Sequence, residues 1–159
     1  MWTVLDSPIG ELRLVENAGT ITAIEFSPFK PSTGRPIGGR QDDHPVLAAA
    51  TDQLTAYFAR ELKEFDLPVA AQGSAFQQQV WAQLSLIGYG ETASYGQLAQ
   101  RLGRTKAASR AVGLANGSNP IPIVIPCHRV IGANGTLIGY AGGLERKQIL
   151  LQLEQEALF

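Results

Sequence analysis

The chain contains one cysteine, Cys127, in the stretch NPIPIVIPCHRVIGANG that covers residues 119–135. His128 and Arg129 follow it directly. The thiolate is the reactive form of cysteine, and a nearby proton acceptor or positive charge helps it to form near neutral pH. The alternative is a small buried core residue, which is the common role of a free cysteine. The residue types around Cys127 therefore indicate a nucleophile, with a structural cysteine as the alternative.

His128 is the candidate base for that nucleophile. The apolar run over residues 121–125 stops at Pro126, which predicts a buried strand that ends just before Cys127. Neighbouring side chains on an extended chain point apart, so a direct hydrogen bond between Cys127 and His128 is not expected. A proton relay through one water is easier to build. The alternative is a histidine that only makes a structural hydrogen bond.

Glu154 is the third candidate because of its place on a helix expected over residues 144–156. It lies four residues after Leu150 and three after Leu151, so it shares the face of these leucines. A carboxylate on a core-facing side is costly unless it is paired. We expect either a glutamate that orients a histidine or a salt bridge to a nearby arginine or lysine.

The composition fits a globular protein that could position such residues in one core or two small ones, with 159 residues, 45% apolar and 17% charged. One cysteine excludes an internal disulfide and a zinc site built from several cysteines, and it fits a reducing compartment. The start of the chain does not resemble a signal peptide, and no segment approaches the ~20 apolar residues that span a bilayer. We therefore expect a cytoplasmic protein that does not bind membranes.

The charge is uneven along the chain. Residues 1–72 hold six basic and ten acidic residues, a net −4, and residues 73–159 hold seven and four, a net +3. A basic second half favours an anionic partner for that part of the chain.

The pattern predicts an α+β protein with two domains, residues 1–72 and 73–159. The first should be a small antiparallel sheet, from TVLD, ELRLVE and ITAIEF, with a helix that begins near Pro45 and buries Leu47, Ala50, Leu54, Phe58 and Leu62. The second should be mostly helical. Two capping boxes, SAFQ and SYGQ, begin its first helices, and IGANGTLIGY reads as a hairpin.

A helix-turn-helix is predicted in the second domain, where a short helix ends at Gly103 and AASRAVGLANG follows. This next helix has almost no bulky side chains, and Arg110 stands alone near its start. Small residues allow close packing in a core. They would also let a helix enter a DNA minor groove, which is about 6 Å wide, with Arg110 as a probe.

PCHRVIG, with NPIPIVI before it and GYAGGLERKQILLQLE after it, resembles the O6-alkylguanine-DNA alkyltransferases of the bacterial cytoplasmic type. The resemblance covers nearly the whole chain. It implies a winged-helix-like second domain and a protein that binds double-stranded DNA through the minor groove, flips O6-alkylguanine out and transfers the alkyl group irreversibly to Cys127. No cofactor or metal is implied, and a monomer that could bind DNA cooperatively is expected.

The resemblance also implies roles for individual residues. His128 would take the proton of Cys127 through a water, and Glu154 would orient His128. Tyr95 would hydrogen-bond the guanine ring, and Asn119 would hold the turn beneath the site. The backbone of Cys127 and Val130 would accept from the exocyclic amine. The residues that would line the alkylguanine pocket are Val130, Tyr140, Ala141 and Pro122. The residues that would contact DNA are Arg110, Ala111, Gly113, Ala115 and Asn116.

Two departures from the family pattern are visible: one extra residue before Arg110, and Gly88 where proline is common. Three other functions stay open at this point. They are a non-catalytic sensor of alkylated DNA, a cysteine hydrolase and a helix-turn-helix regulator with a structural cysteine.

Overall fold

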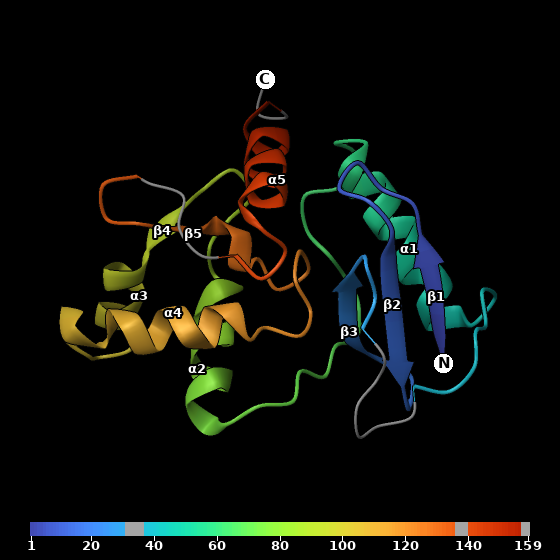
Figure 1. Cartoon of the computed structure of the whole chain (residues 1–159), viewed down its shortest axis with the longest axis horizontal. Helices are drawn as coiled ribbons and strands as arrows, with labels where there is room; N and C mark the ends of the chain where they lie inside the picture. Colours follow the sequence, from blue (N-terminus) through green and yellow to red (C-terminus); the bar gives the residue numbers. More distant parts are fainter. Residues whose placement is uncertain (31–36, 136–139, 157–159) are drawn as a thin grey trace. The chain divides into compact units, whose positions relative to one another are not determined.

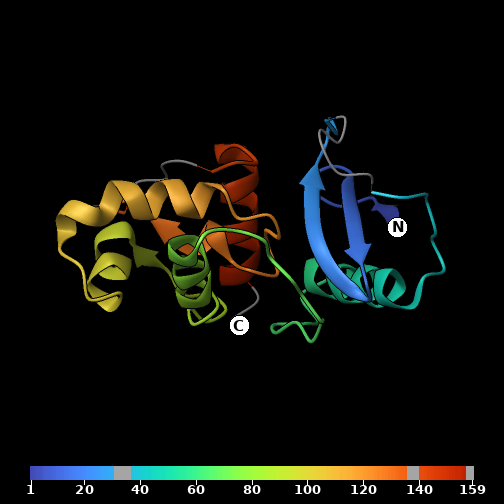
Figure 2. The same ribbon diagram turned by 90° about the horizontal axis from the view of Figure 1, so that it is seen from below.

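The computed structural model describes residues 1–30, 37–135 and 140–156. The chain forms two compact units, Met1–Gln72 and Gly73–Phe159 (Figures 1 and 2). The first holds an antiparallel sheet and a helix, and the second is mostly helical. The predicted α+β class is therefore confirmed.

The sheet of the first unit is the expected antiparallel meander, with strand order β1-β2-β3. Ala18 and Gly19 link the second and third strands with φ angles of 51° and 80°. Two consecutive positive φ angles match the twist of a two-residue hairpin. The strands are β1 (Trp2–Leu5), β2 (Leu12–Asn17) and β3 (Thr20–Phe26).

Helix α1 (Pro45–Phe58) covers one face of this sheet, as both views show (Figures 1 and 2). It begins at the predicted proline. Its buried face is Leu47, Ala50, Leu54 and Tyr57. The prediction of Phe58 and Leu62 on that face was wrong, because the helix ends at Phe58 and Tyr57 completes the stripe one residue earlier.

The second unit begins with the two predicted capping boxes, and both are confirmed. Ser74 and Gln77 form the first and Ser94 and Gln97 the second, each with both reciprocal hydrogen bonds. The elements of this unit are α2 (Ala75–Leu84), β4 (Ala93–Ser94), α3 (Tyr95–Arg101), α4 (Ser109–Gly117), β5 (Val130–Ile131) and α5 (Leu144–Glu156), with 3₁₀ turns η1 (Lys106–Ala108) and η2 (Cys127–Arg129).

Helices α3 and α4 contact each other across η1, which is the predicted helix-turn-helix arrangement (Figure 1). The buried indole of Trp81 in α2 donates to the carbonyl of Ala115 at 2.9 Å and ties α4 to the core. Gly73 is required beside this indole, because a Cβ there would lie 2.4 Å from the Trp81 ring.

The hairpin predicted for IGANGTLIGY is only partly described. A turn is present where the amide of Gly135 donates to the carbonyl of Gly132 at 2.9 Å. Residues 136–139 lie outside the described part of the chain. Strand β5 pairs with β4 in parallel, a contact that the sequence pattern did not predict. Within the described residues no helix is long and apolar enough to cross a membrane.

Candidate active site

The segment before Cys127 is a tight turn, so the predicted strand over residues 121–125 was wrong. Ile123 has a φ of 74°, and the amide of Ile125 donates back to the carbonyl of Ile121 at 2.9 Å. The buried side chain of Asn119 closes the turn. Its Nδ2 donates to the carbonyl of Ile125 at 2.8 Å, and its Oδ1 accepts from the amide of Ile121 at 3.0 Å. Asn119 thus satisfies backbone groups that a strand would have paired with a neighbour.

Cys127 begins the 3₁₀ turn η2 and is 4% exposed. Burial raises the pKa of its thiol from 9.0 to about 11. Hydrogen bonds with Asn119 and Tyr140 and the charge of Lys147 oppose that rise in part. The resting form at neutral pH is therefore the thiol, and a base must take its proton before it can act as a nucleophile.

His128 is fully buried, and its Nε2 lies 2.6 Å from Oε2 of Glu154. Burial lowers the pKa of His128 although Glu154 opposes this shift. A neutral imidazole that donates from Nε2 to a carboxylate keeps its lone pair on Nδ1. Nδ1 is buried and has no hydrogen-bond partner among the described residues. It is therefore available to accept a proton from another group.

Glu154 is 1% exposed and makes both kinds of contact that its helical position predicted. Besides His128, it binds Arg129, whose Nε and Nη2 donate to Oε1 and Oε2 at 2.9 and 3.0 Å. Nη1 of Arg129 donates to the carbonyl of Ile87 at 2.7 Å. Burial alone would raise the pKa of the Glu154 carboxyl, but the hydrogen bonds with His128 and Arg129 lower it from 4.5 to about 2. The carboxylate stays charged and fixes the imidazole.

Lys147 is a residue of the site that the sequence reasoning missed. Its side chain is fully buried, and its Nζ donates to the carbonyl of Val130. Burial lowers the pKa of Lys147, and a negative charge on Cys127 would oppose that shift. It lies seven residues before Glu154 and three before Leu150, on the same helical face. The spacing that identified Glu154 could therefore have found it.

Tyr95 and Tyr140 both interact electrostatically with Cys127. Burial raises the pKa of both phenols, and a negative charge on Cys127 raises them further. Hydrogen bonding with Cys127 contributes to the raised pKa of Tyr140 as well. Of the other predicted pocket residues, Val130 and Pro122 are buried and Ala141 is exposed.

Helix α4 divides the predicted DNA-contacting residues between two faces. Arg110 and Ala111 are exposed, whereas Ala115 and Asn116 are buried at 4% and 2% exposure. Ala115 and Asn116 therefore point into the unit, which contradicts the prediction that they contact a DNA groove. Gly113 is half-buried, and a Cβ there would lie 3.6 Å from the Tyr95 ring.

The exposed face of α4 lies in a basic stretch of chain. Residues 92–144 contain five basic residues and no acidic residue. Four of the five fall between positions 101 and 110, namely Arg101, Arg104, Lys106 and Arg110, and all four are exposed. Such a surface favours a polyanionic partner.

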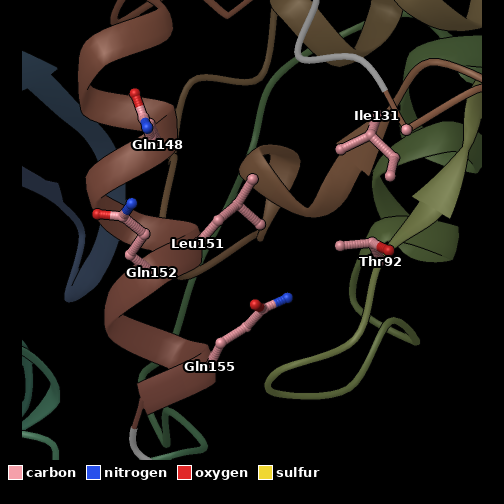
Figure 3. Close-up of a pocket in the computed structure, with 7 residues that line it drawn as sticks. Thr92, Ile131, Gln148, Leu151, Gln152 and Gln155 are labelled. Carbon is pink, nitrogen blue, oxygen red and sulfur yellow. The ribbon is translucent and has the colours of Figure 1, made fainter.

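A half-open hollow of about 260 Å³ is lined by other residues (Figure 3). Its lining includes Thr92, Ile131, Leu151 and the α5 glutamines Gln148, Gln152 and Gln155. Successive side chains of a strand point to opposite faces, so Ile131 faces the hollow when the buried Val130 faces inward. None of the predicted site residues lines it, and the contacts around Cys127 locate the chemistry instead.

The described part of the chain holds no group of three or more His, Cys, Asp or Glu residues that could bind a metal ion.

Comparison with protein families matches both units. Residues 75–156 match the 6-O-methylguanine DNA methyltransferase DNA-binding domain, and residues 1–71 match the ribonuclease-like domain of the same family. The chain belongs to the 6-O-methylguanine DNA methyltransferase family. This membership confirms the resemblance found in the sequence.

Individual members of the methyltransferase family are similar over nearly the whole chain. A methylated-DNA–protein-cysteine methyltransferase of Mycolicibacterium paratuberculosis is 50% identical over 97% of this chain and 92% of its own. One from Methanosarcina acetivorans is 46% identical over 96% and 97%. Among solved structures, Mycobacterium tuberculosis OGT in complex with DNA has a TM-score of 0.87 and 47% identity, covering 98% of this chain and 93% of that one.

The first prediction for this methyltransferase-family chain concerns the resting thiol. A pKa of about 11 instead of 9.0 leaves roughly 100-fold less thiolate at pH 8 than an unperturbed thiol would have. We expect iodoacetamide to label folded Cys127 at least 100-fold more slowly than urea-unfolded Cys127, with the folded rate rising about tenfold per pH unit up to pH 10. Intact mass against time measures both rates. Equal rates would mean that a thiolate is already present in the folded protein.

The second prediction concerns acid stability. Because the pKa of Glu154 is depressed in the folded state, its stabilisation is present above pH 4.5 and is lost as the pH falls toward 2. Between pH 5 and pH 3 this loss should be on the order of 2 kcal/mol. Glu154→Gln should lack that part of the pH dependence in urea-unfolding titrations. Glu145→Gln, at an exposed position of the same helix, is the control. A Glu154→Gln variant with the full pH dependence would contradict the assignment.

Proposed function

We propose that this chain repairs O6-alkylguanine in DNA by moving the alkyl group to its own Cys127. One observation carries the proposal: a buried thiol adjoins a histidine that is fixed by a buried carboxylate at 2.6 Å and whose Nδ1 has no partner in the described structure. The family and the DNA complex of a 47% identical relative support DNA as the partner.

Helix α4 is the part of the chain that we propose for the minor groove. Its exposed face is slim apart from Arg110 and Leu114, and it lies in the basic stretch without carboxylates. An alkylated guanine inside the stack cannot present its O6 substituent to a buried sulfur, so the base must be flipped out. Arg110 would fill the space that the base leaves, and so offset part of the stacking that is lost.

Proton transfer comes first in the proposed chemistry. The Cys127 proton passes through a bridging water to Nδ1 of His128, and the imidazolium is stabilised by the carboxylate of Glu154. The site buries two positively charged side chains, Arg129 and Lys147, and one negatively charged side chain, Glu154. This excess positive charge favours a thiolate at the same place.

Alkyl transfer follows. The thiolate attacks the alkyl carbon, the S–C bond forms, and the C–O6 bond breaks with its electron pair left on guanine. Tyr95 donates its phenolic proton to the ring as this charge develops, so the base leaves as neutral guanine, and the proton that His128 took from Cys127 restores the phenol through solvent. The product is a thioether, so each molecule acts once. No step needs a cofactor.

Several finer properties stay predictions. The minor groove, the monomeric state and the cytoplasmic location follow from the sequence expectations, and the second-unit charge of +3 supports DNA binding in a general way. The hydrolase and regulator alternatives lose their basis because the chain belongs to a methyltransferase family.

The decisive experiment is an intact-mass measurement after incubation with duplex DNA containing O6-methylguanine. We expect one added methyl group per molecule and no further addition with excess DNA. Cys127→Ser should stay unmodified, because a serine hydroxyl is not ionised by this relay. The serine variant should still bind the damaged duplex in a gel-shift assay, which separates binding from chemistry. An unmodified wild-type protein would support the non-catalytic sensor.

A separate prediction tests Arg110. Arg110→Ala should slow methyl transfer from duplex DNA by about tenfold or more, since one lost interaction of about 1.4 kcal/mol has that effect. The same variant should react with free O6-benzylguanine at the wild-type rate. Arg101→Ala removes a charge from α3 that is also exposed and is the matched control, with a smaller, salt-dependent effect on DNA binding. Equal losses of Arg110→Ala on both substrates would remove its role in base flipping.

A further inference from the structure

Asn116 lies in the last turn of α4 and is 2% exposed, so it points into the unit and away from any DNA groove. Its Nδ2 donates to the backbone carbonyl of Cys127 at 3.3 Å. A carbonyl oxygen can only accept a hydrogen bond, so the nitrogen of the amide must be the atom that faces Cys127. The orientation of the amide is therefore determined.

The oxygen of the same amide has no partner. Oδ1 of Asn116 is buried and makes no hydrogen bond within the described part of the chain. The amide also reaches Tyr95, because a hydrogen bond from Asn116 lowers the pKa of that phenol against the larger effect of burial. A buried acceptor without a donor is destabilising, and few native side chains tolerate it. The amide that carries this oxygen thus contacts both the backbone of Cys127 and Tyr95, two groups that the proposed function places beside the alkylated base.

The substrate has one group that fits this oxygen. Alkylation at O6 removes the N1 proton of guanine, and N9 carries the sugar. The exocyclic 2-amino group is then the base's one remaining N–H donor. O4-alkylthymine has no N–H donor on its ring. A buried acceptor beside Cys127 can therefore distinguish these two alkylated bases.

The backbone acceptors nearby are already engaged. The carbonyl of Cys127 accepts from Asn116, and the carbonyl of Val130 accepts from the buried Nζ of Lys147. Each can take a second hydrogen bond, but Oδ1 of Asn116 is the acceptor that has none.

We propose that Oδ1 of Asn116 accepts a hydrogen bond from the exocyclic amine of O6-alkylguanine and so helps to select this base. The inference rests on the proposed function and adds a specificity residue to it. It also gives the two faces of α4 different tasks. The outer face, with Arg110, meets DNA, and Asn116 on the inner face meets the extruded base.

The test compares two free bases that differ by the amine, O6-benzylguanine and O6-benzylhypoxanthine. Asn116→Leu keeps the size of the side chain but removes the Nδ2 donor to the Cys127 carbonyl together with the Oδ1 acceptor, so the ratio of the two rates, in which a loss common to both compounds cancels, isolates the acceptor. We expect this variant to react about tenfold more slowly with the guanine compound and less than twofold more slowly with the hypoxanthine compound, because a site built to hydrogen-bond an N–H discriminates by its presence. The ratio of the two rate constants, from intact mass against time, should fall about fivefold or more.

The ratio separates this role from a structural one. A general disturbance of α4 would slow both reactions equally, as we expect for Val112→Ala, a fully buried position on the same helix. Asn116→Ala provides a second variant should the leucine not fit, and the same fall in the ratio is expected. An unchanged ratio in the folded variants would overturn the inference while leaving the proposed function intact. A wild-type protein that reacts with neither compound nor with methylated duplex would overturn both.

Discussion

The buried carboxylate of Glu154 is the group on which the rest of the site depends. It is the single buried acid in the described part of the second unit, and it binds both His128 and Arg129. Removing a carboxylate from water is costly, and excellent geometry with several hydrogen bonds is needed to offset the cost. Here the guanidinium supplies two of these bonds and the imidazole supplies one. The same contacts that stabilise the charge also fix the histidine tautomer, so stability and chemistry share one network.

The positive charges around this network explain why a buried thiol is compatible with nucleophilic chemistry. Burial keeps Cys127 protonated, with a pKa of about 11. Arg129 and Lys147 are both buried near it, and Glu154 balances one of them. A proton that moves to His128 then leaves a thiolate in a positive environment. In the proposed mechanism, the thiol is therefore unreactive at rest and becomes a nucleophile when His128 takes its proton.

Helix α4 connects this network to the surface. Trp81 holds its backbone from one side, and Asn116 holds the backbone of Cys127 from its inner face. Small residues let the helix approach Tyr95 closely, as Gly113 does. The core-packing and DNA-binding explanations of the small residues are thus compatible. Residues on the inner face pack, while the exposed face stays slim beside Arg110.

The sequence by itself determined the elements with strong local signals. Neighbouring residues are enough to predict the capping boxes at Ser74 and Ser94 and the proline that begins α1. They also show that Glu154 lies on a helical face made of leucines. The antiparallel meander was readable for the same reason, since alternation and turn residues are local. The family motif around Cys127 predicted a nucleophile at this position before any contact was known.

Tertiary structure alone decided the contacts between distant residues. The run of residues 121–125 looked like a strand because it is apolar and β-branched, yet Asn119 bonds its backbone into a turn. Arg129 and Glu154 meet across 25 residues, and Lys147 reaches Val130 across 17. Local pattern cannot specify which buried donor meets which acceptor, since that depends on how helices pack. The orientation of Asn116 also depends on tertiary packing. Its residue type suggested a polar contact, but the packing of α4 determines that this contact is with Cys127.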